Sequence, residues 1–447
     1  MKKSLGMALL ALALSSTSNA QSIVGEAERL WGEGDTIDGN MITEISEGAV
    51  DGAGNVISRP GATLAMGGEG QIIVTTINGV PTVIAREGDA APGGDIIEGF
   101  DNHVERLGDL VLYVASDLDD NPNNGDGDRA LLLRDLNETD PVVIARTGVT
   151  AVPGRAVTFD QIRSGEGFGM GRGGRIAFAG RFEDGGSGSG VYLWDNGSLS
   201  KIVDTDESVR GTQFNGFDHA KVDENGSGVV FFARRDSGAI GSIFLFAGGD
   251  LIELISTTDD YPGSVSSIFD LGEPDIDGGK VSVLVEGSGG ERGIFIFDGQ
   301  GNTTLVADLN TPLPDSPQNT GPATGFADEL GIGGDIVYFE ATRPNGSNEI
   351  MVWRNGLIER LPSQGDVLDG RELEITASRL ERHSMSRSAI VIVASFVDGT
   401  EALYRVPLSA APSSTPATGI PIPWLGFPLG CLLLLIGALS LRRQRQV

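Results

Sequence analysis

Five times along this 447-residue chain, a short apolar run is followed by a small turn pair and a second apolar run. Asn-Gly, Asp-Gly and Gly-Gly pairs favour the positive φ angles of tight hairpin turns, so each site predicts two antiparallel strands. The turns recur about every 50 to 60 residues, which indicates a repeat architecture. The turn pairs are Asn78-Gly79, Asn196-Gly197, Gly248-Gly249, Asp298-Gly299 and Asn355-Gly356.

Aligned on these turns, the units share four strand-like stretches, and helical periodicity is nearly absent between the two ends of the chain. Four-stranded antiparallel units repeated around an axis make a β-propeller. The first stretch of several units carries a Phe-Asp pair. These pairs are Phe100-Asp101, Phe159-Asp160, Phe217-Asp218 and Phe269-Asp270.

The number of units predicts how the ring closes. Six complete units run from about residue 41 to 366, and a seventh begins near Glu372 and supplies only three strands. Residues 28–35 resemble the fourth-strand ending at 85–89, so we expect them to pair into the last blade and remove two exposed sheet edges. The predicted fold class is therefore all-β, a seven-bladed propeller of four-stranded antiparallel blades. Six or eight blades are alternatives, because the first unit is irregular.

Both ends of the chain carry export and membrane signals. A basic start, a short apolar run and a small-x-small site predict a signal peptide over residues 1–20. Residues 21–410 are then the propeller, and 411–424 are a Ser/Thr/Pro-rich linker with a sorting-like motif. The apolar residues 425–441 would span about 26 Å as a helix, at the short limit of a transmembrane crossing. Residues 442–447 form a basic tail expected in the cytoplasm.

Ile420, Pro421 and Trp424, followed by the apolar run and the basic tail, resemble C-terminal sorting signals of bacterial surface proteins, of the type opening Ile-Pro-Thr-Leu. Ile422-Pro423 stands in place of Thr-Leu. The resemblance implies an exported protein, membrane-anchored with its propeller in the periplasm or at the cell surface. It also implies a sorting enzyme as a partner, with release after C-terminal processing. A plain membrane anchor is the alternative.

Composition excludes some partners and chemistries. The chain has 62 Asp and Glu against 32 Lys and Arg, a formal net charge of −30. Such a surface repels nucleic acid, so no nucleic-acid partner is expected. The one cysteine, Cys431, lies in the predicted transmembrane helix, so the exported part has no disulfide and no thiol chemistry.

Residues 117–128 are the most polar segment, inserted between the second and third strands of one unit. Oxygen ligands at alternate positions suit a hard cation such as Ca²⁺. The EF-hand pattern is incomplete, because Asn124 stands at the Gly position and Ala130 at the bidentate Glu position. A solvated, Asx-rich hairpin tip is the alternative. The candidate calcium ligands are Asp117, Asp119, Asn121, Asn123, Asp126 and Asp128.

The repeated aspartates of the Phe-Asp pairs form a second candidate site. Adjacent strand residues point to opposite faces, so an Asp beside an inter-blade Phe would point toward the other neighbour, near the central channel. A partial ring of these carboxylates could hold a cation. The repetition itself favours a structural role, in which each Asp accepts backbone hydrogen bonds and locks its blade. The residues are Asp101, Asp160, Asp218 and Asp270.

Two histidines, His103 and His219, follow Phe-Asp pairs at nearly equivalent positions, which indicates scaffold geometry rather than a zinc site. The sequence has no nucleophile-elbow motif and no Gly-rich phosphate loop that opens a helix. We therefore predict no catalytic residue and no required cofactor other than the candidate calcium.

Residues 225–232, Asn-Gly-Ser-Gly-Val-Val-Phe-Phe, resemble the bacterial tandem-repeat family marked by Asn-x-x-Gly-x-x-Ala-Phe. Residues 171–178 keep the Gly, Ala and Phe of this motif, and residues 86–93 resemble the family's strand-end signature. The family occurs on exported proteins with assorted C-terminal anchors. The resemblance implies the fold and the location, and it transfers no catalytic residue.

These observations predict a non-catalytic, exported surface or envelope protein whose propeller is a binding or structural module, tethered to the membrane through its C-terminus. Loops at one rim would contact a polysaccharide or another surface protein. One alternative is a hydrolase or lyase acting on extracellular polysaccharide, and another is a calcium-stabilised scaffold. Clustering of Asp, Arg and His from several blades at one channel mouth would favour the enzyme.

Overall fold

The chain folds almost entirely into β-strands. The structure, a computed structural model, describes residues 22–409 except for 47, 66, 117–127, 164–166, 317–318 and 377–384. Within this part the only helical element is a 3₁₀ turn, η1, at Arg172–Gly174. No helix among the described residues is long and apolar enough to cross a bilayer. The predicted signal peptide, sorting motif and transmembrane helix lie outside the described residues.

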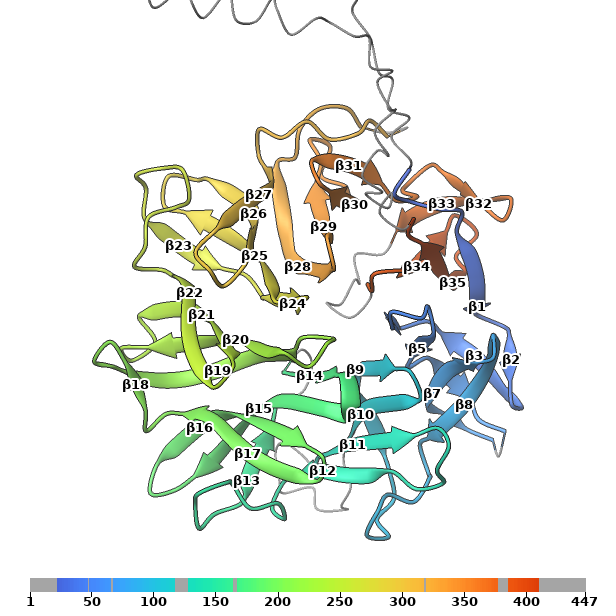
Figure 1. The fold of residues 1–447 in the computed structure, drawn as a ribbon. Coiled ribbons are helices and arrows are strands. Elements are labelled where there is room, and N and C mark those ends of the chain that lie inside the picture. Colours follow the sequence, from blue (N-terminus) through green and yellow to red (C-terminus); the bar gives the residue numbers. More distant parts are fainter. Residues whose placement is uncertain are drawn as a thin grey trace, which may run out of the picture. The chain divides into compact units, whose positions relative to one another are not determined.

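The described strands form seven antiparallel sheets arranged around an axis as a propeller, which we name A to G in chain order (Figure 1). Sheet A contains β2 (Thr36–Ile37), β3 (Asn40–Glu44), β4 (Gly48–Val50), β5 (Val56–Ser58), β6 (Gly61–Thr63), β7 (Glu69–Ile77) and β8 (Val80–Arg86). Sheet B contains β9 (Gly99–Leu107), β10 (Leu110–Ser116), β11 (Ala130–Asp135) and β12 (Val142–Arg146). Sheet C contains β13 (Phe159–Ile162), β14 (Phe168–Gly171), β15 (Arg175–Glu183), β16 (Ser187–Asp195) and β17 (Ser198–Asp204).

The remaining sheets follow the same order. Sheet D contains β18 (Ser208–Val209), β19 (Thr212–Val222), β20 (Gly228–Arg235), β21 (Ile240–Ala247) and β22 (Asp250–Ser256). Sheet E contains β23 (Ile268–Leu271), β24 (Asp275–Asp277), β25 (Lys280–Gly287), β26 (Arg292–Phe297) and β27 (Thr303–Asp308). Sheet F contains β28 (Gly325–Gly333), β29 (Ile336–Thr342), β30 (Asn348–Arg354) and β31 (Leu357–Arg360). Sheet G contains β32 (Val367–Leu368), β33 (Arg371–Thr376), β34 (Ala389–Phe396), β35 (Glu401–Pro407) and β1 (Glu28–Gly32).

Turn chemistry sets the outer hairpins as predicted at four of the five sites. Asn196 and Asn355, for example, have φ of 49° and 51°, each followed by a positive-φ glycine. The Asp298-Gly299 prediction is wrong in its turn length. Strands β26 and β27 pair Phe297 with Thr303, which leaves residues 298–302 in the loop. There the Asp298 carboxylate accepts hydrogen bonds from the backbone N–H groups of Gln300 and Asn302, so it stabilises a longer Asx turn.

The predicted closure of the ring by the N-terminal strand is confirmed. Strand β1 pairs antiparallel with β35, from Glu28 opposite Arg405 to Gly32 opposite Ala402. The segment before β1 is held as well, because the Glu359 carboxylate on sheet F accepts hydrogen bonds from the N–H groups of Ile23 (2.9 Å) and Val24 (3.2 Å). The N-terminal segment therefore joins the last sheet to its neighbour.

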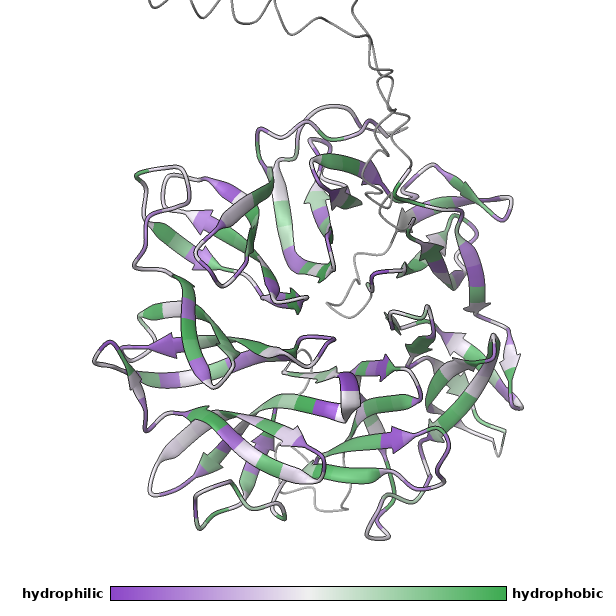
Figure 2. Cartoon of the chain, in the orientation of Figure 1, coloured by the Kyte–Doolittle hydropathy of each residue, from purple (hydrophilic) through white to green (hydrophobic). Residues whose placement is uncertain are grey.

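The apolar core lies between the sheets. Seven clusters of buried side chains each combine residues of two adjacent sheets, and together they run around the ring. The cluster at the closure, for example, packs Trp31 of β1 with Ile72 of sheet A and Val391 of sheet G. Figure 2 shows apolar residues concentrated on the strands and polar residues on many of the connecting loops. Central strands such as β10 and β29 are buried on both faces, as expected for a sheet packed between two neighbouring sheets.

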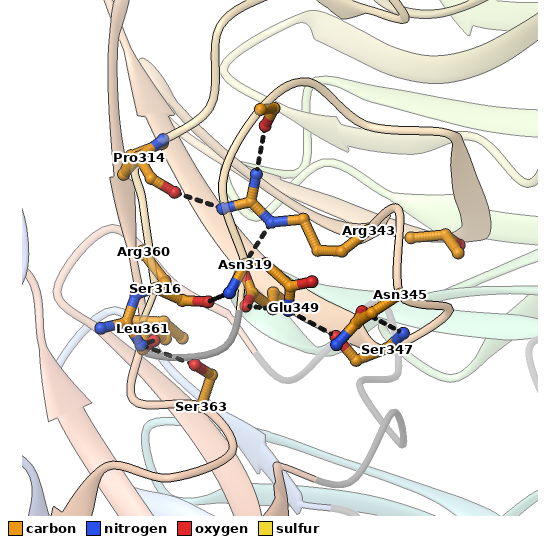
Figure 3. A network of polar contacts seen from close by, with 12 residues as sticks. Pro314, Ser316, Asn319, Arg343, Asn345, Ser347, Glu349, Arg360, Leu361 and Ser363 are labelled. Carbon is orange, nitrogen blue, oxygen red and sulfur yellow. Dashed lines mark hydrogen bonds and ion pairs between the residues drawn. The ribbon is translucent and has the colours of Figure 1, made fainter.

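A buried ion pair fastens the long connection between sheets E and F (Figure 3). Arg343, which is fully buried, donates from Nε to Glu349 Oε2 at 2.6 Å and from Nη1 to the Gly321 carbonyl at 2.7 Å. Its Nη2 donates to the Pro314 carbonyl. Asn319 Nδ2 donates to Ser347 Oγ at 3.0 Å in the same network.

The direction of the strands defines two faces of the ring. Turns between the first and second strands of each sheet surround the axis on one face, which we call the mouth face. Since neighbouring strands are antiparallel, the end of β35 and the start of β1 lie on this face too. Arg405 near the end of β35 donates from Nη1 to the Gly54 carbonyl of a mouth-face turn at 2.8 Å, in agreement with this placement.

Candidate functional site at the axis of the ring

All seven sheets contribute to a small cavity of about 60 Å³ on the axis. One lining residue from each sheet, A to G, is Val50, Arg106, Met170, Val222, Ile276, Ile332 and Met385. A wider pocket of about 480 Å³ at the mouth face shares Asp51, Gly52, Leu107 and Glu224 with the lining of this cavity, and we call it the mouth pocket. It is lined by turns of sheets A, B, C, D and G.

Aspartates at the ends of inner strands join neighbouring sheets near this axis. Each carboxylate accepts a hydrogen bond from a backbone N–H of the next sheet, 55 to 57 residues further along the chain. The distances range from 2.5 to 3.1 Å. We call these residues the axial aspartates. The pairs are Asp51 with Gly108, Asp223 with Gly278 and Gly279, Asp275 with Ile332, and Asp277 with Gly334.

Asp223 and Asp51 each accept four hydrogen bonds, and Asp223 is the more deeply buried of the two. It also accepts hydrogen bonds from Ser227 Oγ at 2.6 Å and from the Asn225 N–H at 3.0 Å. Burial opposes ionisation of this carboxyl, but the hydrogen bonds from Ser227 and the backbone outweigh it and hold its pKa below the ordinary value. The residue is therefore anionic at neutral pH, and its carboxylate joins sheet D to sheet E.

Cations from other sheets neutralise two more axial aspartates. Lys221 Nζ lies 2.5 Å from Asp275 Oδ1. Arg387 of sheet G binds Asp277 of sheet E through two parallel bonds, Nε to Oδ2 at 2.7 Å and Nη2 to Oδ1 at 2.6 Å. A bidentate guanidinium–carboxylate pair of this kind positions both groups firmly.

Glu224 of sheet D extends across the axis toward sheet A. A Cβ added to Gly52 would lie 2.6 Å from Glu224 Oε1, so a glycine at this turn makes room for the carboxyl. Burial raises the pKa of Glu224, and the nearby charges of Asp277 and Asp51 raise it further. The guanidinium groups of Arg387 and Arg172 act in the opposite direction.

Arg172 stands beside Glu224 at the rim of the mouth pocket. Its backbone N–H donates to the Glu224 carbonyl at 2.8 Å, which joins the turns of sheets C and D. Its side chain is exposed, and within the described residues its guanidinium makes no hydrogen bond or ion pair. The mouth pocket is thus lined by two arginines, from sheets C and G, and by two carboxyl groups, Asp51 of sheet A and Glu224 of sheet D.

The structure places the repeated aspartates of the Phe-Asp pairs away from both axial pockets. Asp101 lies 3.8 Å from Arg129 Nε, and Asp218 lies 3.8 Å from Arg163 Nη2. Asp160 and Asp270 are exposed. The acids that line these pockets come later in each unit, and the role of the four repeated aspartates stays a prediction.

One of the four Phe-Asp pairs is also out of register. Phe100, Phe159 and Phe217 are buried, whereas Phe269 is 72% exposed and Ile268 takes the buried position. Ile268 pairs with Gly287 as Phe159 pairs with Phe182, so the alignment is shifted by one residue in sheet E. A shift of one residue along a strand exchanges the two faces.

The two histidines lie in polar contacts of the scaffold. His103 Nε2 is 3.9 Å from Glu105 Oε1, and its ring packs edge-on against Phe168. His219 Nδ1 is 3.3 Å from Glu273 Oε1. In the part of the chain that the structure describes, no group of three or more His, Cys, Asp or Glu could hold a metal ion.

Most of the candidate calcium segment, residues 117–127, lies outside the described residues. Its last member, Asp128, is described. Asp128 Oδ2 lies 3.5 Å from Arg146 Nη2, and its Oδ1 accepts a hydrogen bond from Thr147 Oγ1 at 3.3 Å. Calcium binding stays a prediction.

The sequence analysis missed the axial aspartates and the mouth pocket. A signal exists in hindsight, because Asp51, Asp223 and Asp277 each directly follow an apolar residue and precede a glycine-containing turn. Glu224 and Arg387 carry no such signal, since each lines the pocket beside residues that are far away in the sequence.

The fold and its axial bonds define a β-propeller protein. The chain belongs to a family of unknown function, DUF7453, which matches residues 48–361. No curated protein matches the chain.

Solved structures share the fold at low identity. An oligogalacturonate lyase in complex with manganese is 12% identical over 86% of this chain and 98% of its own, with a TM-score of 0.47. A Mycobacterium tuberculosis puromycin-hydrolysing peptidase is 12% identical over 86% of this chain, with a TM-score of 0.46, and this chain spans 55% of its length. The β-propeller domain of the Trilobed protease from Pyrococcus furiosus is 13% identical over 73% of this chain and 100% of its own, with a TM-score of 0.39.

Proposed function

We propose that this protein is a non-catalytic, exported binding module of the cell envelope, tethered to the membrane through its C-terminus. The observation that carries the proposal is the state of the axial aspartates. Asp51, Asp223 and Asp277 are committed to bonds between sheets, and an acid held in this way is a poor proton donor or nucleophile. The axial aspartates therefore stabilise the closed ring.

The proposal includes seven blades, one for each sheet, with β1 completing the seventh. Two features support this count: seven inter-sheet cores follow one another around the ring, and all seven sheets line one cavity. A sorting signal at Ile420, Pro421 and Trp424, export by residues 1–20 and a membrane anchor at 425–441 belong to the same proposal and rest on the sequence.

The mouth pocket is the proposed binding site, because it is a concave pocket lined by convergent polar groups and an apolar wall of Leu107 and Leu110. The partner class is a polysaccharide or another surface protein, with a sorting enzyme acting on the tail.

A binding screen on the full chain in detergent tests this function. Glycans and envelope proteins are tested for saturable binding, in parallel with a panel of hydrolase and lyase substrates. We expect saturable binding that Arg172→Ala weakens, without turnover. Turnover without saturable binding would overturn the proposal.

A polysaccharide hydrolase or lyase is the second candidate. Its supporting observation is the break in repeat symmetry at the mouth, where Arg172, Glu224 and Arg387 come from three different sheets. The raised pKa of Glu224 is a property of general acids. In that case Glu224→Gln would abolish turnover while substrate binding persisted.

A further inference from the structure

The charged groups of the mouth pocket are not equally available to a ligand. Both oxygens of Asp51 are occupied: Oδ1 accepts from the Ala53 and Asn55 N–H groups, and Oδ2 accepts from Asn55 Nδ2 and the Gly108 N–H. Nε and Nη2 of Arg387 are occupied by Asp277. Asp51 and Arg387 therefore shape the pocket, and the atoms named here already have hydrogen-bond partners within the protein.

Arg172 and Glu224 are less committed, one cation and one acid on adjacent turns: Glu224 Oε2 lies 4.0 Å from Arg387 Nε, beyond hydrogen-bonding distance. The Arg172 side chain is exposed, and the side chain of Glu224 is 23% exposed. Leu107 and Leu110, both half-buried, form an apolar wall of the same pocket. A complementary ligand would present an anionic group, a cationic group and a short apolar part.

We propose that the mouth pocket binds a small amphoteric ligand of the amino-acid class, with its carboxylate on Arg172, its ammonium on Glu224 and its aliphatic side chain against Leu107 and Leu110. This assignment rests on the proposed binding function and adds, for this pocket, a small ligand to the polysaccharide or protein partner named above.

The charge of the whole protein supports a ligand without net charge. At a formal net charge of −30, a purely anionic ligand would be repelled at a distance, and it would also face Glu224 in the pocket. A purely cationic ligand would be attracted by the acidic protein. In the pocket, however, the Arg172 guanidinium would repel this ligand and would gain no partner from it. A zwitterion satisfies both groups, and complementary charge of this kind gives specificity.

The protonation of Glu224 gives the site a pH dependence. The charged groups that face it are Asp277, Asp51, Arg387 and Arg172, and burial with the two aspartates raises its pKa. Below this raised pKa the carboxyl is neutral and no longer pairs with an ammonium. Affinity for the zwitterion therefore falls as the pH drops through the pKa of Glu224, and Glu224→Gln removes that dependence.

The test is calorimetry with the full chain in detergent and three probes at pH 7: leucine, N-acetylleucine and leucinamide. Leucine carries both charges, N-acetylleucine only the anion and leucinamide only the cation. We expect leucine to bind about tenfold more tightly than either blocked compound, since each loses one charge-assisted contact. Arg172→Ala should weaken leucine about tenfold to the level of leucinamide. The matched control is Arg181→Ala, an exposed arginine of the same sheet, which should leave the affinity unchanged.

Equal binding of leucine and N-acetylleucine, or of leucine and leucinamide, would overturn the assignment, as would leucine binding that Arg172→Ala leaves intact. No leucine binding at millimolar concentration would overturn it too. If leucine fails while a glycan or protein still binds and is weakened by Arg172→Ala, the proposed function stands and only the ligand class is wrong. If nothing binds, both are wrong.

Discussion

Asp223 of sheet D accepts a hydrogen bond from the backbone N–H of Gly279 in sheet E at 2.8 Å, and it does so from a fully buried position. The same carboxylate also binds Gly278, Ser227 and Asn225, so one side chain closes its own turn and holds the next sheet. Similar bonds made by Asp51, Asp275 and Asp277 recur around the axis.

Removing this carboxylate should loosen the junction between sheets D and E. We expect Asp223→Ala to lower the free energy of unfolding by about 3 kcal/mol, because buried N–H groups lose a charged acceptor. Denaturant unfolding measures the change, with Asp250→Ala, at an exposed site of the same sheet, as the control. A difference of under ~0.5 kcal/mol between the two variants would show that the bond is dispensable.

The depressed pKa of Asp223 also sets the sign of a pH effect. The carboxylate stabilises the fold at neutral pH, and this contribution is lost as the pH falls through the lowered pKa of the folded state. The acid-induced loss of stability should therefore be shallower in Asp223→Ala than in the wild type.

The periodic features of this fold are predictable because they are local. Asn196-Gly197 and Asn355-Gly356 specify hairpins through their own backbone preferences, and the resemblance of residues 28–35 to another fourth strand is enough to predict the closure. The shift at Ile268-Phe269 is not predictable from the motif, because both residues are apolar and only packing decides which is buried. The mouth pocket is harder still, since Glu224 and Arg387 are far apart in the chain and meet only when the ring is closed.

Glu359 provides a test of the closure. Its carboxylate holds the N–H groups of Ile23 and Val24, and the Ser409 N–H donates to the Ile23 carbonyl at 2.8 Å. We expect Glu359→Ala to reduce stability by about 1 to 2 kcal/mol and to speed hydrogen exchange in residues 22–32. Glu374→Ala, at an exposed position on sheet G, is the matched control. Unchanged exchange of β1 would mean that pairing with β35 alone holds the strand.

The calcium hypothesis can be decided by chelation. A metal bound by the loop at 117–128 would have to compete with Arg146 and Thr147 for Asp128. We therefore expect the melting temperature to be the same with and without a chelator. A fall of several degrees that added calcium reverses would establish the calcium-stabilised scaffold instead.

Glu340 on β29 gives the sharpest pH prediction. It is 2% exposed, and burial, with a further contribution from the charge of Glu329, raises its pKa from 4.5 to about 7. Between these two values the folded state holds a proton that the unfolded state releases, so stability falls as the pH rises from about 4.5 to 7 and levels off above. Glu340→Gln keeps the shape without the charge. Its stability relative to the wild type should therefore rise by roughly 1 to 3 kcal/mol between pH 5 and pH 8. Thermal or denaturant unfolding at several pH values measures this difference. Parallel curves of unfolding free energy against pH for the two proteins would show that folding does not shift the pKa of Glu340.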